Sequence, residues 1–288
     1  MAAVSREPSR GRVAILAGAG NLPTHVARAI RSAGEDPFII ALSAEADGDW
    51  TSFQHEHIGT GDFAAVERIV RVNGIDRLIL SGSVKRRPEW REIRPTWKTL
   101  ARMPGVVRTL LRGGDDQVLR MVIALIESAG ARVIGAHEVA PDLVATLGAL
   151  TTVEPDAASR RDIAAGREAA LALGRLDLGQ AAVAIGGRVV ALEGVEGTDE
   201  MLARVADLRC RGRLSTSRKG VLVKFCKPGQ DERADLPTIG AGTVKGLIEA
   251  GLAGVAVEAG RSLLLEREAA ISAANEAGIF IAGVTRED

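Results

Sequence analysis

Residues 12–34 read RVAILAGAGNLPTHVARAIRSAG, and their pattern indicates the class of fold. An apolar run ends in glycines and leads into the spacing of an amphipathic helix, which predicts a strand, a turn and a helix. Gly18 and Gly20 resemble the start of a dinucleotide-binding fingerprint, but Pro23 stands where that fingerprint has its third glycine. The turn is therefore either an ordinary strand-to-helix connection or a helix N-terminus whose free N–H groups receive an anion or a nucleotide.

The same alternation continues through the first half of the chain. Strands are predicted at residues 36–42, 75–84 and 131–139, and helices at residues 62–73 and 115–130. Strands that alternate with helices form a parallel sheet, and ligands bind beyond the carboxyl ends of its strands. Four residues should share that edge: Gly18, Gly20, Gly82 and Ser83.

The second half is also expected to be mixed α/β. The pattern becomes polar and irregular at residues 141–156, so we place a boundary there and expect two domains, residues 1–150 and 151–288. Two apolar runs joined at Gly186-Gly187 predict a β-hairpin.

Composition limits the function. The 37 basic and 37 acidic residues balance, which argues against a general nucleic-acid binder. Cys210 and Cys226 lie outside any metal-ligand spacing and fit a reducing compartment. Because the N-terminus lacks a signal peptide's apolar core and no apolar run reaches the length of a membrane span, we expect a cytoplasmic protein.

A basic segment at residues 85–112 interrupts this balance. It carries nine Lys and Arg side chains against two Glu, with Trp90 and Trp97 interleaved. Such a segment either binds phosphates or an anionic leaflet, which would make the protein peripheral at the inner membrane, or forms a solvated helical face.

Residues 224–242, KFCKPGQDERADLPTIGAG, form the strongest candidate for a site. Pro228 and Pro237 stiffen the loop, which carries both signs of charge. It is either a phosphate site beside a cation-binding carboxylate or a solvated turn. Asp115 and Asp116 open a helix, where one carboxylate suffices as a cap and the other is left for a metal or substrate.

Carboxylates, lysines and arginines near turns suit metal-assisted phosphoryl transfer. The nucleophile-elbow, P-loop and zinc-binding motifs of other enzyme classes are absent from the sequence.

Seven short motifs, in this order, resemble a known family. They are GAGNLP (18–23), GSVKRRP (82–88), GGDDQVLR (113–120), GAHEV (135–139), DLGQAAV (177–183), EGTDEML (196–202) and KPGQDERADLPTIG (227–240). The family is the cytoplasmic, Mg²⁺-dependent UDP-2,3-diacylglucosamine pyrophosphatase of lipid A biosynthesis, and the resemblance covers nearly the whole chain beyond Gly11. It implies hydrolysis of UDP-2,3-diacylglucosamine to UMP and lipid X, which is 2,3-diacylglucosamine 1-phosphate. It also implies a Rossmann-like N-terminal domain, a catalytic C-terminal domain, lipid held between them, and a homodimer.

The resemblance also implies roles for individual residues. The catalytic candidates are Asp235, Asp231, Lys227, Arg233 and Gln230. The substrate-binding candidates are Gly18, Gly20, Asn21, Leu22, Gly82, Ser83, Arg86, Asp115, Asp116, Thr198 and Asp199. We expect Mg²⁺, with Mn²⁺ as a substitute, on Asp235 and Asp116, and a water that attacks the α-phosphorus. The GSVKRRP stretch carries one arginine more than the family's shorter form, which leaves open whether Arg86 or Arg87 faces the substrate.

Two other functions compete with this one. The glycine turn also suits a nicotinamide-dependent oxidoreductase, although the third glycine and a ribose-binding acid are missing from the expected places. A non-catalytic protein that binds nucleotide-linked lipids would use the same arginines and glycines but would have no chemical task for Asp231 and Asp235.

Overall fold

The computed structural model describes residues 11–84 and 115–287 and divides the chain into two compact units. The first unit comprises Met1–Ala140 with Arg233–Asp235, and the second comprises Pro141–Glu232 with Leu236–Asp288. Residues 141–150, which we expected in the first domain, fall in the second unit. The reason is that β6 (Gly148–Ala149) pairs antiparallel with β13 (Phe280–Val284) of the second sheet.

The first unit contains a five-stranded parallel sheet with the order β3-β2-β1-β4-β5. Its strands are β1 (Arg12–Ala17), β2 (Phe38–Leu42), β3 (His55–Ile58), β4 (Ile75–Ser81) and β5 (Arg132–Ile134). This order is that of doubly wound dinucleotide-binding folds, so the predicted α/β class is confirmed. Strand β3 was not predicted, because it is a polar edge strand in which only Ile58 is buried.

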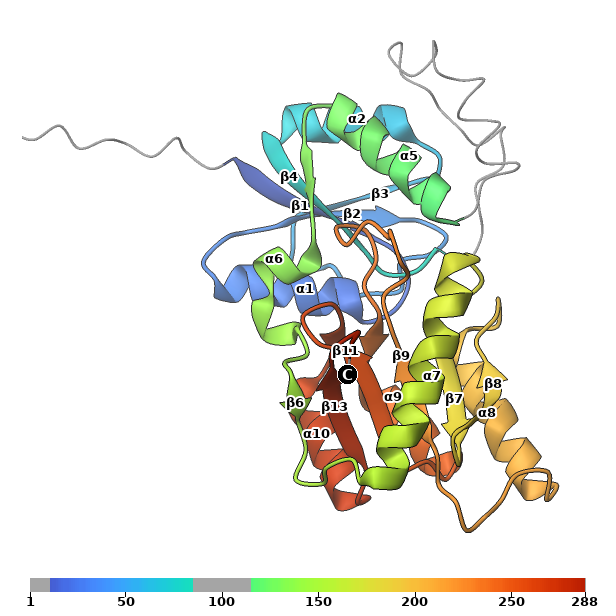
Figure 1. Cartoon of the computed structure of the whole chain (residues 1–288). Coiled ribbons are helices and arrows are strands. Elements are labelled where there is room, and N and C mark those ends of the chain that lie inside the picture. The colour runs from blue at the N-terminus through green and yellow to red at the C-terminus, as the bar shows by residue number, and fades with distance from the viewer. Residues whose placement is uncertain (1–10, 85–114, 288) are drawn as a thin grey trace, which may run out of the picture. The chain divides into compact units, whose positions relative to one another are not determined.

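Helices cover both faces of this sheet (Figure 1). They are α1 (Leu22–Ser32), α2 (Phe63–Val72), α5 (Asp115–Ser128) and the short α6 (Ala136–Val139). Asp62 begins α2 as a cap, since its Oδ1 accepts the backbone N–H of Ala65 at 3.0 Å. Ile40 and Leu78 of the sheet are fully buried in one cluster with Ile69 of α2 and Ile126 of α5.

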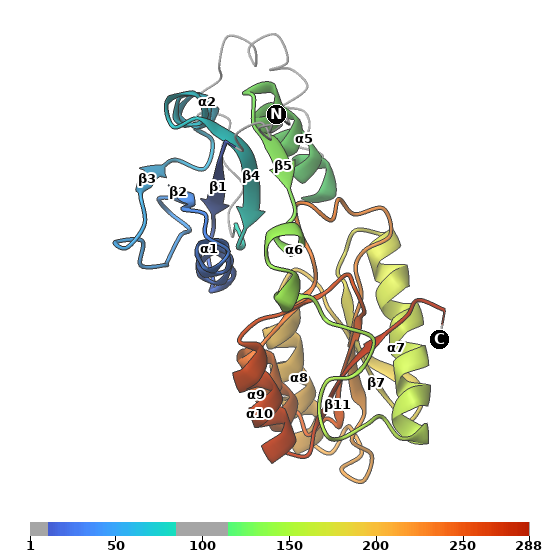
Figure 2. The same cartoon turned by 90° about the vertical axis from the view of Figure 1, so that its left-hand side faces the viewer.

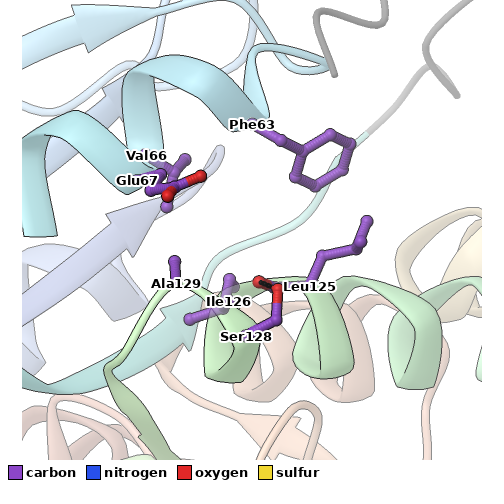
Figure 3. A pocket seen from close by; sticks show the side chains of 7 residues that line it. All are labelled: Phe63, Val66, Glu67, Leu125, Ile126, Ser128 and Ala129. Atoms are coloured by element: carbon purple, nitrogen blue, oxygen red, sulfur yellow. Dashed lines mark hydrogen bonds between the residues drawn. The ribbon is translucent and has the colours of Figure 1, made fainter. Parts of the chain in front are cut away.

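A small depression lies between α2 and α5 (Figure 3). Its lining is mostly apolar and consists of Phe63, Val66, Glu67, Leu125, Ile126, Ser128 and Ala129. The cavity volume is about 10 Å³, which suits one water molecule rather than a substrate.

The second unit contains a six-stranded sheet with the order β6-β13-β11-β9-β7-β8. The remaining strands are β7 (Ala181–Ile185), β8 (Arg188–Leu192), β9 (Val221–Lys224) and β11 (Gly254–Glu258), and β9, β11 and β13 run parallel. The predicted hairpin is confirmed as β7 and β8, joined by Gly186 and Gly187 with φ of 63° and 77°. A separate parallel pair is formed by β10 (Thr238–Ile239) and β12 (Leu263–Leu264).

The second sheet also has helices on both faces (Figure 2). One face is covered by α7 (Ala157–Arg175), and the other by α8 (Gly197–Cys210), α9 (Ala241–Glu249) and α10 (Arg267–Glu276). Neighbouring residues of β9 face opposite sides, since Leu222 packs with the cluster of α8 and α9 and Val223 with that of α7. Because β9, β11 and β13 are parallel, their carboxyl ends lie at one edge of the sheet. The loop that we singled out as the candidate site follows β9 at this edge.

Candidate active site

The loops after β1 and β4 interlock at the carboxyl edge of the first sheet. The N–H of Ala19 donates to the carbonyl of Ser83 at 2.8 Å, and the N–H of Ser83 donates to the carbonyl of Ala19 at 3.0 Å. Gly82 has a φ of 87°, and a Cβ there would lie 2.9 Å from Cγ of Pro23. The close approach that the fingerprint's third glycine allows is thus provided by Gly82, which directly follows the neighbouring strand β4. The structure brings Gly18, Gly20, Gly82 and Ser83 to one edge, as predicted.

Gly20 also has a positive φ, of 91°, and precedes Asn21 and Leu22 at the start of α1. Its backbone N–H donates to Oδ1 of Asp47 at 2.9 Å. The backbone N–H of Gly20, which belongs to the turn that we considered for anion binding, therefore already donates to a carboxylate of the chain itself. Asp47 was not singled out from the sequence, because it lies in the polar stretch after β2 that carries no motif.

In the second unit, the loop that follows β9 starts beside a buried carboxylate. Glu258 at the end of β11 is 3% exposed, and its Oε2 accepts the N–H of Cys226 at 3.0 Å. Arg286 donates to both carboxylate oxygens, with Nε 2.5 Å from Oε1 and Nη2 3.1 Å from Oε2. Arg261 adds a third contact, with Nη1 3.0 Å from Oε1 of Glu258, and its Nη2 lies 2.8 Å from Oε1 of Glu232. Two arginines therefore fix both ends of residues 226–232.

Lys227 and Gln230, two predicted catalytic residues, lie together in a tight turn. The carbonyl of Lys227 accepts the N–H of Gln230 at 3.1 Å, and Oε1 of Gln230 accepts the N–H of Lys227 at 3.0 Å. Gly229 has a φ of 77° within this turn. The Lys227 ammonium donates to Oδ1 of Asp177 at 2.7 Å. Asp177 belongs to a motif that we quoted, but we gave it no role.

Lys224 lies at the last position of β9 and is 8% exposed. Its Nζ donates to Oγ1 of Thr198 at 3.0 Å and to the carbonyl of Thr238 at 3.1 Å. Oγ1 of Thr198 in turn donates to Oε1 of Glu193 at 2.5 Å, and Glu193 is 8% exposed. Thr198, predicted to bind substrate, here joins a buried cation to a buried carboxylate. Lys224 could have been recognised from the sequence, because it is a lysine within an otherwise apolar strand.

The remaining predicted residues fall in several places. Nη1 of Arg233 lies 3.0 Å from Oε1 of Glu127 in α5, and Arg233–Asp235 belong to the first compact unit. Asp235 is exposed, and Asp231 is half-buried in the second unit. Asp199 is exposed in the first turn of α8. Asp115 and Asp116 begin α5, but their side chains lie outside the described residues, as does Arg86.

Comparison with known proteins identifies the family. The model of the LpxI N-terminal domain matches residues 12–143, and that of the LpxI C-terminal domain matches residues 146–282. UDP-2,3-diacylglucosamine pyrophosphatase LpxI from Caulobacter vibrioides (strain ATCC 19089 / CIP 103742 / CB 15) is 38% identical over 279 residues, which cover 96% of this chain and 99% of that protein. The chain belongs to the LpxI family. The resemblance inferred from the seven motifs is confirmed.

The LpxI domain matches meet between residues 143 and 146, close to the division of the chain after Ala140. Arg286 lies beyond the matched range, although it binds Glu258 and the carbonyl of Cys226. Within the described part of this LpxI-family chain, no helix combines the length and apolar character needed to cross a bilayer.

The described residues of this LpxI-family chain constrain how a metal could be held. Across residues 11–84 and 115–287, no three His, Cys, Asp or Glu side chains gather as ligands. Glu193 already accepts a hydrogen bond from Thr198, and Glu258 already forms ion pairs with Arg261 and Arg286. Mg²⁺ needs only one or two carboxylates when water and substrate phosphates complete its shell. The exposed carboxylate of Asp235 fits that type of site and not an all-protein cage.

Proposed function

We propose that this protein hydrolyses the pyrophosphate of UDP-2,3-diacylglucosamine to lipid X and UMP, as a Mg²⁺-dependent enzyme of lipid A biosynthesis. The observation that carries the proposal is the 38% identity to a UDP-2,3-diacylglucosamine pyrophosphatase, which extends over 96% of the chain. The loop at residues 227–235 supplies the cations and carboxylates that such a reaction requires.

In the proposed reaction a water oxygen attacks the α-phosphorus. The bond from that phosphorus to the bridging oxygen breaks, UMP keeps the water oxygen, and lipid X leaves with the bridging oxygen. The chain's part is to hold the pyrophosphate and to orient the water. Lys227, Arg233 and Gln230 would bind phosphate oxygens, and Asp231 or Asp235 would accept a hydrogen bond from the water.

A divalent cation would be held by Asp235 and Asp116, with water and phosphate oxygens completing its shell. When bound, Mg²⁺ supplies positive charge that neutralises the phosphate oxygens, and Mn²⁺ is expected to substitute for it.

The first unit would bind the nucleotide at the edge formed by its glycine loops. The Gly20 amide is held by Asp47 at 2.9 Å, so a phosphate at this turn would have to displace that carboxylate. Asp47→Asn should therefore strengthen the binding of UMP, which isothermal titration calorimetry would measure.

The central test is a turnover assay on the purified chain. UDP-2,3-diacylglucosamine and Mg²⁺ are added and UMP is quantified by chromatography, with parallel reactions in EDTA and in Mn²⁺. We expect UMP in the metal-containing reactions only. Asp235→Ala should fold and lose turnover, whereas Asp207→Ala, which removes an exposed carboxylate paired with Arg211, should not change the rate.

Other outcomes of this assay favour other functions. Tight binding of the intact substrate without UMP release would favour the non-catalytic lipid-nucleotide binder, and a substrate-dependent change in nicotinamide absorbance would favour the oxidoreductase. In ¹⁸O-water the label should enter UMP, and label in lipid X would show attack on the β-phosphorus instead. We further propose a homodimer and peripheral contact with the inner membrane, to be tested by light scattering and vesicle flotation.

A further inference from the structure

Helix α7 ends in a Schellman motif whose left-handed residue is an aspartate. The N–H of Asp177 donates to the carbonyl of Gly174, and the N–H of Leu178 to that of Leu173, both at 3.2 Å. Asp177 has a φ of 54°; among the described residues only it and Glu266 have a positive φ without being glycine. Glycine is the usual residue at this position, because a side chain is strained in the left-handed region.

The charge of Asp177 is also unfavourable for the helix. Helix C-termini carry a partial negative charge and favour lysine, arginine or histidine. Asp177 follows the last helical turn directly, after the C-cap residue Leu176. Glycine would relieve the backbone strain at this position, and a cationic side chain would interact favourably with the helix end. Asp177 does neither, which points to a role for its side chain outside the helix.

That role is visible in the contact with Lys227. Oδ1 of Asp177 accepts a hydrogen bond from Nζ of Lys227 at 2.7 Å, within the short range of charge-assisted bonds. The lysine side chain is 16% exposed and the aspartate side chain 29% exposed, so water only partly surrounds the pair.

The backbone packing around this pair fixes its geometry. A Cβ on Gly174 would lie 2.8 Å from Cδ of Pro228 and 3.1 Å from Cα of Lys227, so the end of α7 touches the loop directly. On the other side, the turn from Lys227 to Gln230 is closed by two hydrogen bonds. Because both backbones are fixed, the Asp177 carboxylate determines where the lysine side chain can point.

We propose that Asp177 is the positioning residue of Lys227: it holds the ammonium in the orientation in which it meets a phosphate oxygen of the substrate. This inference rests on the proposed function. It places a strained aspartate at the end of α7 so that a lysine 50 residues away is preorganised.

The test separates stability from activity. Asp177→Gly removes the carboxylate and the strain together, so the melting temperature should stay equal or rise while kcat falls about 100-fold. Asp177→Asn tolerates the left-handed backbone and can still accept a hydrogen bond, so kcat should fall about tenfold. Asp207→Asn is the matched control, because it neutralises an aspartate in an exposed ion pair with Arg211 and should leave kcat unchanged.

A double-mutant cycle shows whether Asp177 acts through Lys227. Adding Asp177→Gly to Lys227→Ala should cause no further loss of kcat, while independent effects would multiply and overturn the proposal. Asp177→Gly with wild-type kcat and KM would also overturn it. If Asp177→Gly fails to fold, the same double-mutant cycle is measured with Asp177→Asn. Independent effects on kcat, or wild-type kcat and KM in Asp177→Asn, would then overturn the proposal.

Failure of the proposed function would look different. If the wild-type protein releases no UMP, the contact between Asp177 and Lys227 is tested without turnover. An amine-selective acylating reagent is added, and peptide mass spectrometry measures how much of Lys227 is labelled. Labelling of Lys227 should rise several-fold in Asp177→Gly relative to wild type and stay unchanged in Asp207→Asn. Equal labelling of Lys227 in wild type and Asp177→Gly would overturn the positioning role.

Discussion

Arg286 holds Glu258 through two hydrogen bonds, from Nε at 2.5 Å and from Nη2 at 3.1 Å, and the same Nη2 donates to the carbonyl of Cys226 at 2.9 Å. Glu258 also accepts the N–H of Cys226, so one ion pair binds both backbone groups of that residue. The side chain of Glu258 is 4% exposed. A residue near the end of the chain thus fixes the point at which the candidate loop leaves β9.

Arg286→Ala should lower the free energy of unfolding by about 2–3 kcal/mol, because a buried carboxylate keeps only one of its two arginines. Arg286→Lys should be intermediate, since an ammonium cannot donate to both oxygens in the same plane. Urea denaturation measures both. The control is Arg211→Ala, which breaks an exposed pair with Asp207 and should cost about 0.5 kcal/mol. Equal effects of Arg286→Ala and Arg211→Ala would contradict this assignment.

Gly82→Ala should destabilise the first unit more than Gly20→Ala. Both glycines have a positive φ, of 87° and 91°, so alanine is strained at either position. Only at Gly82 would the new Cβ also collide with backbone, at 2.7 Å from the carbonyl oxygen of Ala19. We expect losses of about 1 kcal/mol for Gly20→Ala and about 3 kcal/mol or more for Gly82→Ala. Chemical denaturation followed by circular dichroism would show the difference, and equal losses would mean that the collision is relieved.

Thr198→Val should break the link between Lys224 and Glu193. Valine has the same shape but no hydroxyl, so two buried charged groups each lose one hydrogen bond. Hydrogen bonds to charged groups contribute about 1.5–3 kcal/mol, and the loss in unfolding free energy should lie in that range or above it. Thr198→Ser keeps the hydroxyl and should cost less than about 1 kcal/mol. A Thr198→Val protein as stable as Thr198→Ser would show that the hydroxyl is not needed.

Local patterns predicted most of the fold. The run at residues 12–17 ends in glycines that turn the chain, and Gly186-Gly187 accepts the positive φ of a hairpin, so neighbouring residues decide each element. Strand β3 escaped prediction because its HEHI pattern buries only Ile58. Its strand conformation depends on pairing with β2, which is a tertiary contact.

The candidate site was predictable only in part. The turn from Lys227 to Gln230 is local and followed from the proline and glycine within it. The partner of Lys227, Asp177, lies 50 residues away, and the partner of Arg286, Glu258, lies 28 residues away. Glu258 and Arg286 meet because β11 and β13 end at the same edge of the sheet, whereas Asp177 meets Lys227 because helix α7 ends against the loop after β9. No local pattern reveals which side chains meet at these places.

Cys226 should resist alkylation at pH 8 while Cys210 reacts. Burial disfavours the thiolate and raises the pKa of Cys226 from 9.0 to about 11, whereas Cys210 is exposed. A rise of two units makes the reactive thiolate about 100-fold rarer, and its labelling should accelerate only as the pH approaches 11. Since the unfolded thiol loses its proton first, the same shift lowers the free energy of unfolding as the pH rises from about 9 to 11. Peptide mass spectrometry after iodoacetamide treatment measures the labelling, and both cysteines should react alike in denaturant. Equal labelling of the two in the native protein at pH 8 would contradict the burial of Cys226.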